Sequence, residues 1–219
     1  MTLPVSKTAF GFSDVATRLR THLSLDVPHD PLGDSFASAG DHVLNPDIED
    51  TYLAQTRKAA AVLVPMVARD DEVTVLLTQR TAHLRSHAGQ IAFPGGKIDA
   101  TDASPIHAAL REAHEEIGLE AKHIEPVGFL NPYLTGTGFR ILPVVGLVTP
   151  PFDLDVNPGE VDDAFEVPLS FLMNPDNHKR DSREWNGKTR HFYAMPYQER
   201  YIWGATAGIL RNLYERLYS

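Results

Sequence analysis

The chain contains no cysteine, and this absence excludes several kinds of site. A disulfide framework, a thiolate nucleophile and a metal site built on cysteine all need that residue. The absence also fits the reducing conditions of the cytoplasm, where disulfides are rare. Any chemistry must therefore come from oxygen and nitrogen groups, and we expect a cytoplasmic protein.

Long apolar segments are missing as well. A membrane-spanning helix needs about 18 or more consecutive apolar residues, and no such run occurs. The first residues, Met1 to Phe10, lack the continuous apolar region of a secretory signal. We therefore expect a soluble, untargeted protein, and we find no internal repeat or low-complexity segment.

Positive charge is in deficit, because 20 Lys and Arg residues stand against 29 Asp and Glu, a formal net charge of −9. Nucleic-acid binders hold phosphates with clustered basic residues, so this balance argues against a general nucleic-acid binder. An anionic small molecule would need a local basic pocket and a metal ion to overcome the overall negative field.

What is present is an ordinary globular composition, with 42% hydrophobic and 22% charged residues. The length of 219 residues suits one α/β domain with a substantial core. Residues 28–50 are rich in Pro, Gly, Asp and Ser, which is typical of a connection. We therefore expect an N-terminal extension over residues 1–50, packed on one domain of residues 51–219.

The pattern of apolar residues predicts a strand-rich chain with one central and one terminal helix. Strands are expected over residues 59–68, 73–78, 90–93, 124–130, 141–148, 160–167, 190–195 and 200–203, the first two as a hairpin. Helical segments are expected over residues 13–23, 51–58, 104–117, 169–173 and 204–218. Such a chain predicts a mixed sheet covered on both faces.

One stretch, residues 95–119, combines a glycine turn, a polar loop and a helix. Ser104 and Pro105 are typical of a helix start, and Gly118 of a helix end. Apolar residues at helical spacing predict a stripe that faces the core, with the carboxylates lying off it. The stripe consists of Ile106, Leu110, Ala113 and Ile117.

Three glutamates of this helix, Glu112, Glu115 and Glu116, form an acidic cluster. Glu112 and Glu116 are four residues apart and stack on one side, where like charges repel by about 0.2–0.5 kcal/mol per pair. A hard divalent cation would offset that repulsion, since Mg²⁺ and Mn²⁺ prefer oxygen ligands. The alternative is a solvated acidic helix face with one neighbouring arginine.

The stretch resembles the Nudix box, which runs Gly, five residues, Glu, seven residues, then Arg-Glu-hydrophobic-x-Glu-Glu-x-Gly-hydrophobic. Five residues lead from Gly96 to Asp102, and residues 111–119 match every specified position of the second half. Asp102 stands where the pattern has Glu, and eight residues rather than seven separate it from Arg111. Asp102 either bridges the loop to the helix start or is a simple turn residue.

The upstream residues 76–96 resemble the additional signature of the coenzyme A pyrophosphatase branch of the Nudix hydrolases. An Asp and the longer spacing are usual in that branch. The two signatures adjoin and together cover residues 76–119. The resemblance implies an α/β fold, the Nudix α/β/α sandwich with a mixed sheet.

The resemblance also implies roles for the helix residues. Glu112, Glu116 and Glu115 would be catalytic and would hold Mg²⁺ or Mn²⁺, with the carbonyl of Gly96 as a backbone ligand. Arg111 would orient a catalytic glutamate, whereas a simple surface ion pair is worth only ~0–1 kcal/mol. The general base stays open between this cluster and a Glu of a later loop, and Glu160 and Asp162 are candidates for an additional carboxylate.

Four basic residues near the box, Arg80, Arg85, His87 and Lys97, are candidates for binding the substrate. An arginine can donate two bonds to one phosphate, and the 3′-phosphate of coenzyme A gives a reason for several cations. The alternative is that these side chains are solvated surface charges or structural groups.

The implied reaction is metal-dependent hydrolysis of the diphosphate of coenzyme A or a derivative to 3′,5′-ADP and 4′-phosphopantetheine or its acyl form. The alternatives are a Nudix hydrolase of another nucleoside diphosphate compound, such as NADH, ADP-ribose or a dinucleoside polyphosphate, and a non-catalytic nucleotide-binding module. The expected partners are a small-molecule substrate and a second copy of the chain in a homodimer, with no nucleic acid and no membrane.

Overall fold

The computed structural model describes residues 10–27, 39–46, 58–84, 87–185 and 187–219. A nine-stranded sheet forms its centre, with the strand order β1-β7-β8-β2-β3-β4, while β5 pairs with β2, β6 with β8 and β9 with β3. The strands are β1 (Ala39–Gly40), β2 (Lys58–Val67), β3 (Thr74–Arg80), β4 (Ile91–Ala92), β5 (Gly95–Lys97), β6 (Ile124–Phe129), β7 (Tyr133–Leu134), β8 (Phe139–Val148) and β9 (Val161–Pro168).

The sheet is mixed, as expected. β2 and β8 run parallel over ten residue pairs, from Lys58 opposite Phe139 to Val67 opposite Val148. β3 pairs with β2 and β9 in the antiparallel sense. Eight consecutive residues of β2, from position 60 to position 67, are buried. A strand covered on both faces reads as a continuous apolar run, which explains why this segment lacks alternation.

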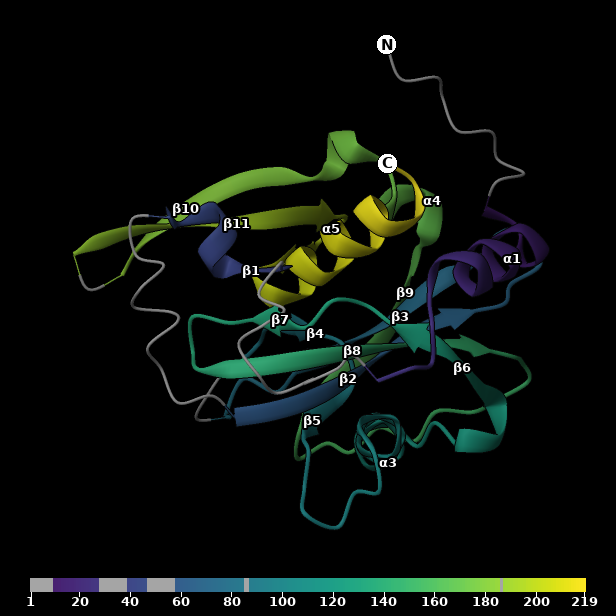
Figure 1. The fold of residues 1–219 in the computed structure, drawn as a ribbon. Helices are drawn as coiled ribbons and strands as arrows, with labels where there is room; N and C mark the ends of the chain where they lie inside the picture. The colour runs from purple at the N-terminus through teal and green to yellow at the C-terminus, as the bar shows by residue number, and fades with distance from the viewer. Residues whose placement is uncertain (1–9, 28–38, 47–57, 85–86, 186) are drawn as a thin grey trace.

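Helices cover both faces of this sheet (Figure 1). α3 lies on one face, whereas α1, α5 and a second sheet of three strands, ordered β10-β11-β12, lie on the other. The elements are α1 (Phe12–His22), α3 (Pro105–Ile117), α4 (Leu169–Leu172), α5 (Ala205–Leu217), β10 (Lys179–Trp185), β11 (Lys188–Tyr197), β12 (Arg200–Trp203) and the short 3-10 helices η3 (Asp41–Leu44), η5 (Ala121–His123) and η6 (Pro175–Asn177). The observed fold confirms the predicted α/β architecture.

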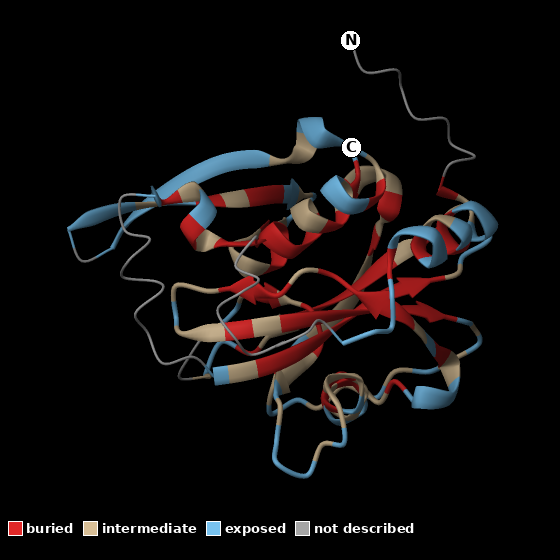
Figure 2. Ribbon diagram, in the orientation of Figure 1, coloured by how far each residue is buried: buried red, intermediate tan, exposed pale blue. Residues whose placement is uncertain are grey.

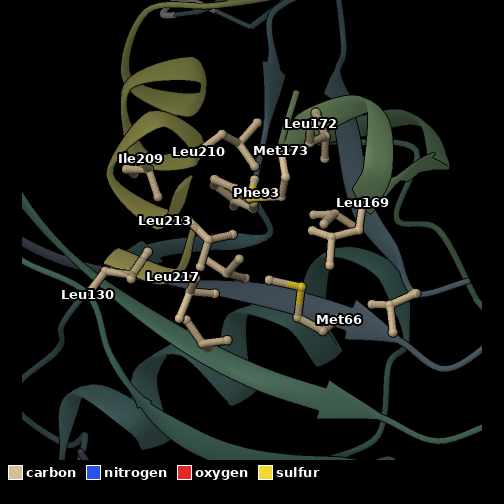
Figure 3. Close-up of a cluster of buried hydrophobic side chains, with 14 of the residues drawn as sticks. Met66, Phe93, Leu130, Leu169, Leu172, Met173, Ile209, Leu210, Leu213 and Leu217 are labelled. Carbon is tan, nitrogen blue, oxygen red and sulfur yellow. The ribbon is translucent and has the colours of Figure 1, made fainter. Parts of the chain in front are cut away.

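The core consists of two clusters, one on each face of the central sheet. Figure 2 shows the buried residues running along the middle strands and the inner sides of the helices. In the larger cluster, Met66 of β2 lies among leucines of α4 and α5, including Leu169 and Leu213 (Figure 3). The smaller cluster lies under α3, so the helix that carries the acidic residues is held directly on the sheet.

The predicted elements agree with the observed ones to within a few residues, apart from the unpredicted two-residue strands β1 and β7 and three further differences. The predicted glycine turn at 95–96 is wrong, because Gly95 and Gly96 pair with Val62 and Ala61 of β2 as strand β5. β10 was not predicted, because all its side chains are exposed and show no apolar alternation. Most of the helix predicted over residues 51–58 lies outside the described residues, and Lys58 begins β2.

We propose that residues 1–50 form an extension packed on the domain of residues 51–219. In support, Val15 and Leu19 of α1 are fully buried in the larger core cluster. Arg18 donates a 2.8 Å bond from Nη1 to the carbonyl of Leu217 in α5.

Across the described ranges of the chain, no helix has both the length and the apolar character needed to cross a membrane.

Candidate active site

α3 has the ends that its sequence predicts. Ser104 Oγ accepts a 3.1 Å bond from the His107 amide, and Pro105 begins the helix. Gly118 closes it with a left-handed φ of 69°, a conformation that glycine adopts without steric penalty. Because both ends are fixed, the side chains between them have a defined register against the sheet.

The buried side of α3 differs from the predicted stripe. Ala108 and Ala109 are fully buried, while Ile106 and Leu110 are only partly buried at its margin. Small residues let the helix lie close to the sheet. The expectation that the carboxylates lie off the buried side is therefore wrong for Glu116, which is buried at 2% exposure.

The side chain of Glu116 extends from α3 toward the end of β3. Its carboxylate accepts a 3.1 Å bond from the Gly95 amide and a 3.4 Å bond from Arg80 Nη1. Burial raises the pKa of Glu116 to about 7, the two bonds oppose that rise, and the charges of Glu112 and Glu160 add to it. The site thus contains a carboxyl that titrates near neutral pH in the metal-free protein.

Glu112 lies directly over strand β5. A Cβ atom at Gly96 would lie only 2.5 Å from the Glu112 carboxylate, so any side chain at this position would displace that carboxylate. Burial raises the pKa of Glu112, and the neighbouring charges of Glu115 and Glu160 act in the same direction. The Glu112 carboxylate therefore packs against the backbone of Gly96, whose carbonyl is a proposed metal ligand.

Arg111 joins the polar loop to the acidic cluster. Its Nε and Nη2 donate to the two oxygens of Asp102 at 3.0 and 2.9 Å. Its Nη1 donates to Glu112 and to Glu115, both at 3.0 Å. One guanidinium therefore holds three carboxylates, which is the planar, multidentate use that lysine cannot reproduce.

Asp102 is the anchor of this network. Its side chain is 1% exposed and also accepts bonds of 2.9 Å from the Asp99 amide and from His107 Nδ1. The bonds from Arg111 hold the pKa of Asp102 well below its usual range. Of the two readings left open by the sequence, the geometry supports the bridge between loop and helix.

The segment before β9 adds the carboxylate of Glu160 to the three glutamates of α3. The Asp155 and Asn157 amides donate to the last carbonyls of α3, on Ile117 and Glu116, at 3.0 and 2.9 Å. This segment leads to Glu160, whose carbonyl accepts from the Thr81 amide at 3.0 Å. Backbone bonds therefore fix Glu160 to both the helix end and the end of β3.

These donors fit a hard divalent cation by their chemistry. Within the described ranges, no group of three or more His, Asp or Glu side chains already converges as a ready ligand set. The carboxylates of Glu112 and Glu116 are instead held by Arg111, by Arg80 and by the Gly95 amide. Burial and mutual repulsion nevertheless raise the pKa of both, and a bound cation would relieve that strain.

The predicted substrate-binding residues have different positions. Arg80 points to Glu116, and Lys97 has an exposed side chain while its carbonyl accepts from Arg111 at 3.3 Å. His87 has a left-handed φ of 58°, and its Nδ1 lies 2.9 Å from Gln90 Oε1. Arg85 lies outside the described residues.

Two contributors to the site were not anticipated. The Gly95 amide was expected only to shape a turn, yet it donates to Glu116. His107 supports Asp102 from the first turn of α3, five residues away in sequence. A histidine placed just after a Ser-Pro helix start and a loop aspartate is a usable signal for such a contact.

Comparison with known proteins gives a consistent family assignment. A family model described as NUDIX domain matches residues 57–186. The uncharacterized Nudix hydrolase NudL of Enterobacter sp. (strain 638) is 40% identical over 185 residues, covering 84% of this chain and 94% of that protein. NudL of Escherichia coli (strain K12) is 40% identical over 171 residues, covering 78% of this chain and 88% of that protein.

Solved structures with a similar fold include the Nudix domain of Shewanella oneidensis NrtR in complex with ADP ribose. It has a TM-score of 0.47 and 19% identity, covering 79% of this chain and 98% of that chain.

Proposed function

This chain belongs to the Nudix hydrolase family, and from that premise we propose that it hydrolyses the diphosphate bond of coenzyme A or a derivative. The products are 3′,5′-ADP and 4′-phosphopantetheine, or its acyl form when the substrate is an acyl-CoA. The reaction depends on Mg²⁺ or Mn²⁺.

The observation that carries the proposal is the packing of Glu112 and Glu116 against the backbone of Gly95 and Gly96, next to Glu160. Carboxylates that raise each other's pKa in a partly buried site are costly to keep without a cation. Such a set suits Mg²⁺ or Mn²⁺, which share their oxygen ligands between protein and phosphates. Glu112, Glu116, Glu115 and the Gly96 carbonyl are the groups that would hold the metal.

When bound, the metal would neutralise phosphate oxygens and lower the pKa of a water molecule. The protein residues do the positioning. Arg111 fixes the directions of Glu112 and Glu115, and the Gly95 amide fixes one oxygen of Glu116. A carboxylate of this cluster or Glu160 accepts the proton of the attacking water, with the choice among them left to mutagenesis.

The CoA assignment is supported by the place of residues 76–96 in the fold. This segment, which resembles the branch signature, supplies both Arg80 and the Gly95 amide to Glu116. Arg80 and Gly95 of this segment therefore belong to the wall of the site itself. We propose that Arg80, Arg85, His87 and Lys97 bind the phosphates of the substrate.

The direct test is hydrolysis of CoA by the purified protein with Mg²⁺ or Mn²⁺, with products identified by mass. NADH, ADP-ribose and diadenosine polyphosphates at equal concentration are the comparison substrates, and EDTA and the Glu116→Gln variant are the blanks. We expect 3′,5′-ADP and a clear preference for CoA. Cleavage of another diphosphate but not CoA would remove the CoA assignment, and no cleavage of any substrate would overturn the proposed hydrolysis.

A further inference from the structure

We propose that the free edge of β10 pairs with β10 of a second copy of this chain, antiparallel and centred on Ser182, so that two three-stranded sheets become one sheet of six. β10 is the edge strand of its sheet, and every residue in it is exposed. The β10–β11 hairpin projects from the body of the molecule (Figures 1 and 2), and among the described residues no strand pairs with the other edge of β10. The proposal is independent of the catalytic reaction.

The hydrogen bonds of β11 determine which backbone groups of β10 face outward. Ser182 lies opposite His191 in the antiparallel pair of β10 and β11. The amide and carbonyl of His191 bond to the side chain of Asn45, at 2.8 and 2.9 Å, and so point away from β10. Opposite residues of an antiparallel ladder either bond to each other or both face away. The amide and carbonyl of Ser182 therefore face the free edge.

A second contact agrees with this assignment. The Ser182 amide donates a 2.7 Å bond to the side chain of the preceding residue, Asp181, which a bond to β11 would not allow. Because the amides and carbonyls of successive residues in a strand point to opposite edges, those of Arg180 and Glu184 also face the free edge. Even-numbered residues of one copy must then pair with even-numbered residues of the other.

The order of charges along β10 is self-complementary. When Ser182 lies opposite Ser182 of a second copy, Arg180 faces Glu184 and Asp181 faces Arg183. The two-fold axis repeats each pair, which gives four opposite-charge pairs. Directly opposite residues have Cβ atoms about 4.5–5.5 Å apart, within reach of ion pairing.

The neighbouring registers are disfavoured by the same charges. A shift that places Ser182 opposite Arg180 sets Asp181 against Asp181 and Lys179 against Arg183. The shift in the other direction sets Arg183 against Arg183. Like charges directly opposite destabilise a strand pair, so only the register centred on Ser182 is favourable. Exposed edges commonly carry charge that discourages pairing, but here each charge from position 180 to position 184 has one of opposite sign at the matching position on the other side of Ser182.

The end of the hairpin fits the same register. Trp185 is a large hydrophobic residue that is 58% exposed, with Arg190 beside its ring at 5.7 Å. In the proposed pair it lies opposite Lys179 of the second copy, and an ammonium over an indole ring is a favourable contact. The arrangement is isologous, so it closes at two copies and does not extend into a fibre.

The test is sedimentation of the full chain from about 1 µM to about 1 mM, the range in which weak pairs dissociate. We expect a reversible dimer for the wild type. Arg180→Glu and Glu184→Arg should each weaken it by at least about tenfold, because each sets like charges opposite one another at both symmetric positions. An equimolar mixture of the two variants should recover a heterodimer, since each chain then supplies the charge that the other lacks.

Two further variants separate pairing from other effects. Ser182→Pro removes an outward amide without removing a bond to β11, and it should abolish the dimer while keeping the circular dichroism spectrum. Glu199→Arg makes the same charge change as Glu184→Arg at an exposed turn after β11, and it should leave the dimer intact. A wild type that stays monomeric at about 1 mM, a dimer unaffected by either charge variant, or a mixture that recovers no heterodimer would each overturn the proposal.

Discussion

The α3 face of the central sheet and the β10–β11 hairpin both concentrate charge, but their charges have different surroundings. In the α3 network, Arg111 is 23% exposed and Asp102 1%, and both make several bonds within the chain. In β10 every charged residue is exposed to solvent, and the bonds that Asp181 accepts from Tyr201 and Glu184 accepts from Thr189 lie at the surface. The difference teaches that partly buried ion pairs fix geometry, whereas exposed ones add little stability and stay available to a partner.

The largest expected effect tests the centre of the α3 network. Glu116→Gln keeps the shape of the side chain but removes a charge from the metal-binding set. We expect kcat to fall by at least roughly a hundredfold, as for loss of one strong electrostatic contribution to a transition state. Steady-state assays with CoA and Mg²⁺ measure it.

The matched control is Glu120→Gln, which changes an exposed glutamate just beyond the helix that pairs with Lys122. It should keep kcat within about twofold, since exposed pairs contribute little. Wild-type turnover in Glu116→Gln would sink the metal assignment.

The next effect tests whether Arg111 acts through its planar fork. Arg111→Lys keeps the charge but cannot hold Asp102, Glu112 and Glu115 together. We expect kcat to fall about 10- to 100-fold with a smaller change in KM, as when support of a metal ligand is lost. Asp102→Asn should lower kcat less, because one acceptor oxygen remains.

Arg20→Lys provides the comparison for this prediction, because Arg20 forms an exposed pair with Glu125. If Arg20→Lys and Arg111→Lys lowered kcat equally, the partial burial of the Arg111 network would contribute nothing to catalysis.

A smaller effect concerns the stability of the metal-free protein. The pKa of Glu116 is raised from 4.5 to about 7. Between these values the unfolded chain has already lost the proton that the folded chain keeps, so the free energy of unfolding falls as pH rises through this window. The shift corresponds to roughly 3 kcal/mol. Urea unfolding in EDTA at several pH values measures it.

The Glu116→Gln variant should lack this component of the pH dependence, and the difference between the two curves isolates it. Adding Mg²⁺ at pH 7 should stabilise the wild type more than the variant. If the free energy of unfolding changed equally with pH in the wild type and in Glu116→Gln between pH 4.5 and 7, Glu116 would not titrate in that range.

The smallest effect is expected in the hairpin. Arg180→Glu should change kcat/KM by less than about twofold, because exposed surface charges contribute little to the stability of a single chain. The assay is run at a protein concentration where the wild type is monomeric. If Arg180→Glu lowered activity as much as Arg111→Lys does, the contrast between the α3 network and the hairpin would be wrong, since the hairpin would then be part of the site.

Much of α3 could be predicted, because its signals are local. Ser104, Pro105 and Gly118 define its ends within a short stretch, and the spacing of Arg111 and the glutamates defines their relation on the helix. The order of the helix and the main strands follows from apolar periodicity for the same reason.

The remainder depends on contacts between distant residues. Arg80 and Glu116 are 36 positions apart, and only the packed sheet brings them together. The burial of Glu116 opposes the usual exposure of glutamate. Strand β10 forms because β11 pairs with it, since its own sequence has no apolar face. Gly95 and Gly96 are likewise poor strand formers that become a strand through β2.

The two glycines of β5 have separate consequences for mutational tolerance. A Cβ at Gly95 would meet the backbone of Ala61 and Val62 at 2.5 and 2.6 Å, so any side chain there disturbs the sheet. The three atoms nearest to a Cβ at Gly96 would all belong to the movable carboxylate of Glu112. In a saturation library, variants substituted at position 95 should therefore fail a screen for folded protein. Variants substituted at position 96 should pass that screen and fail a screen for turnover.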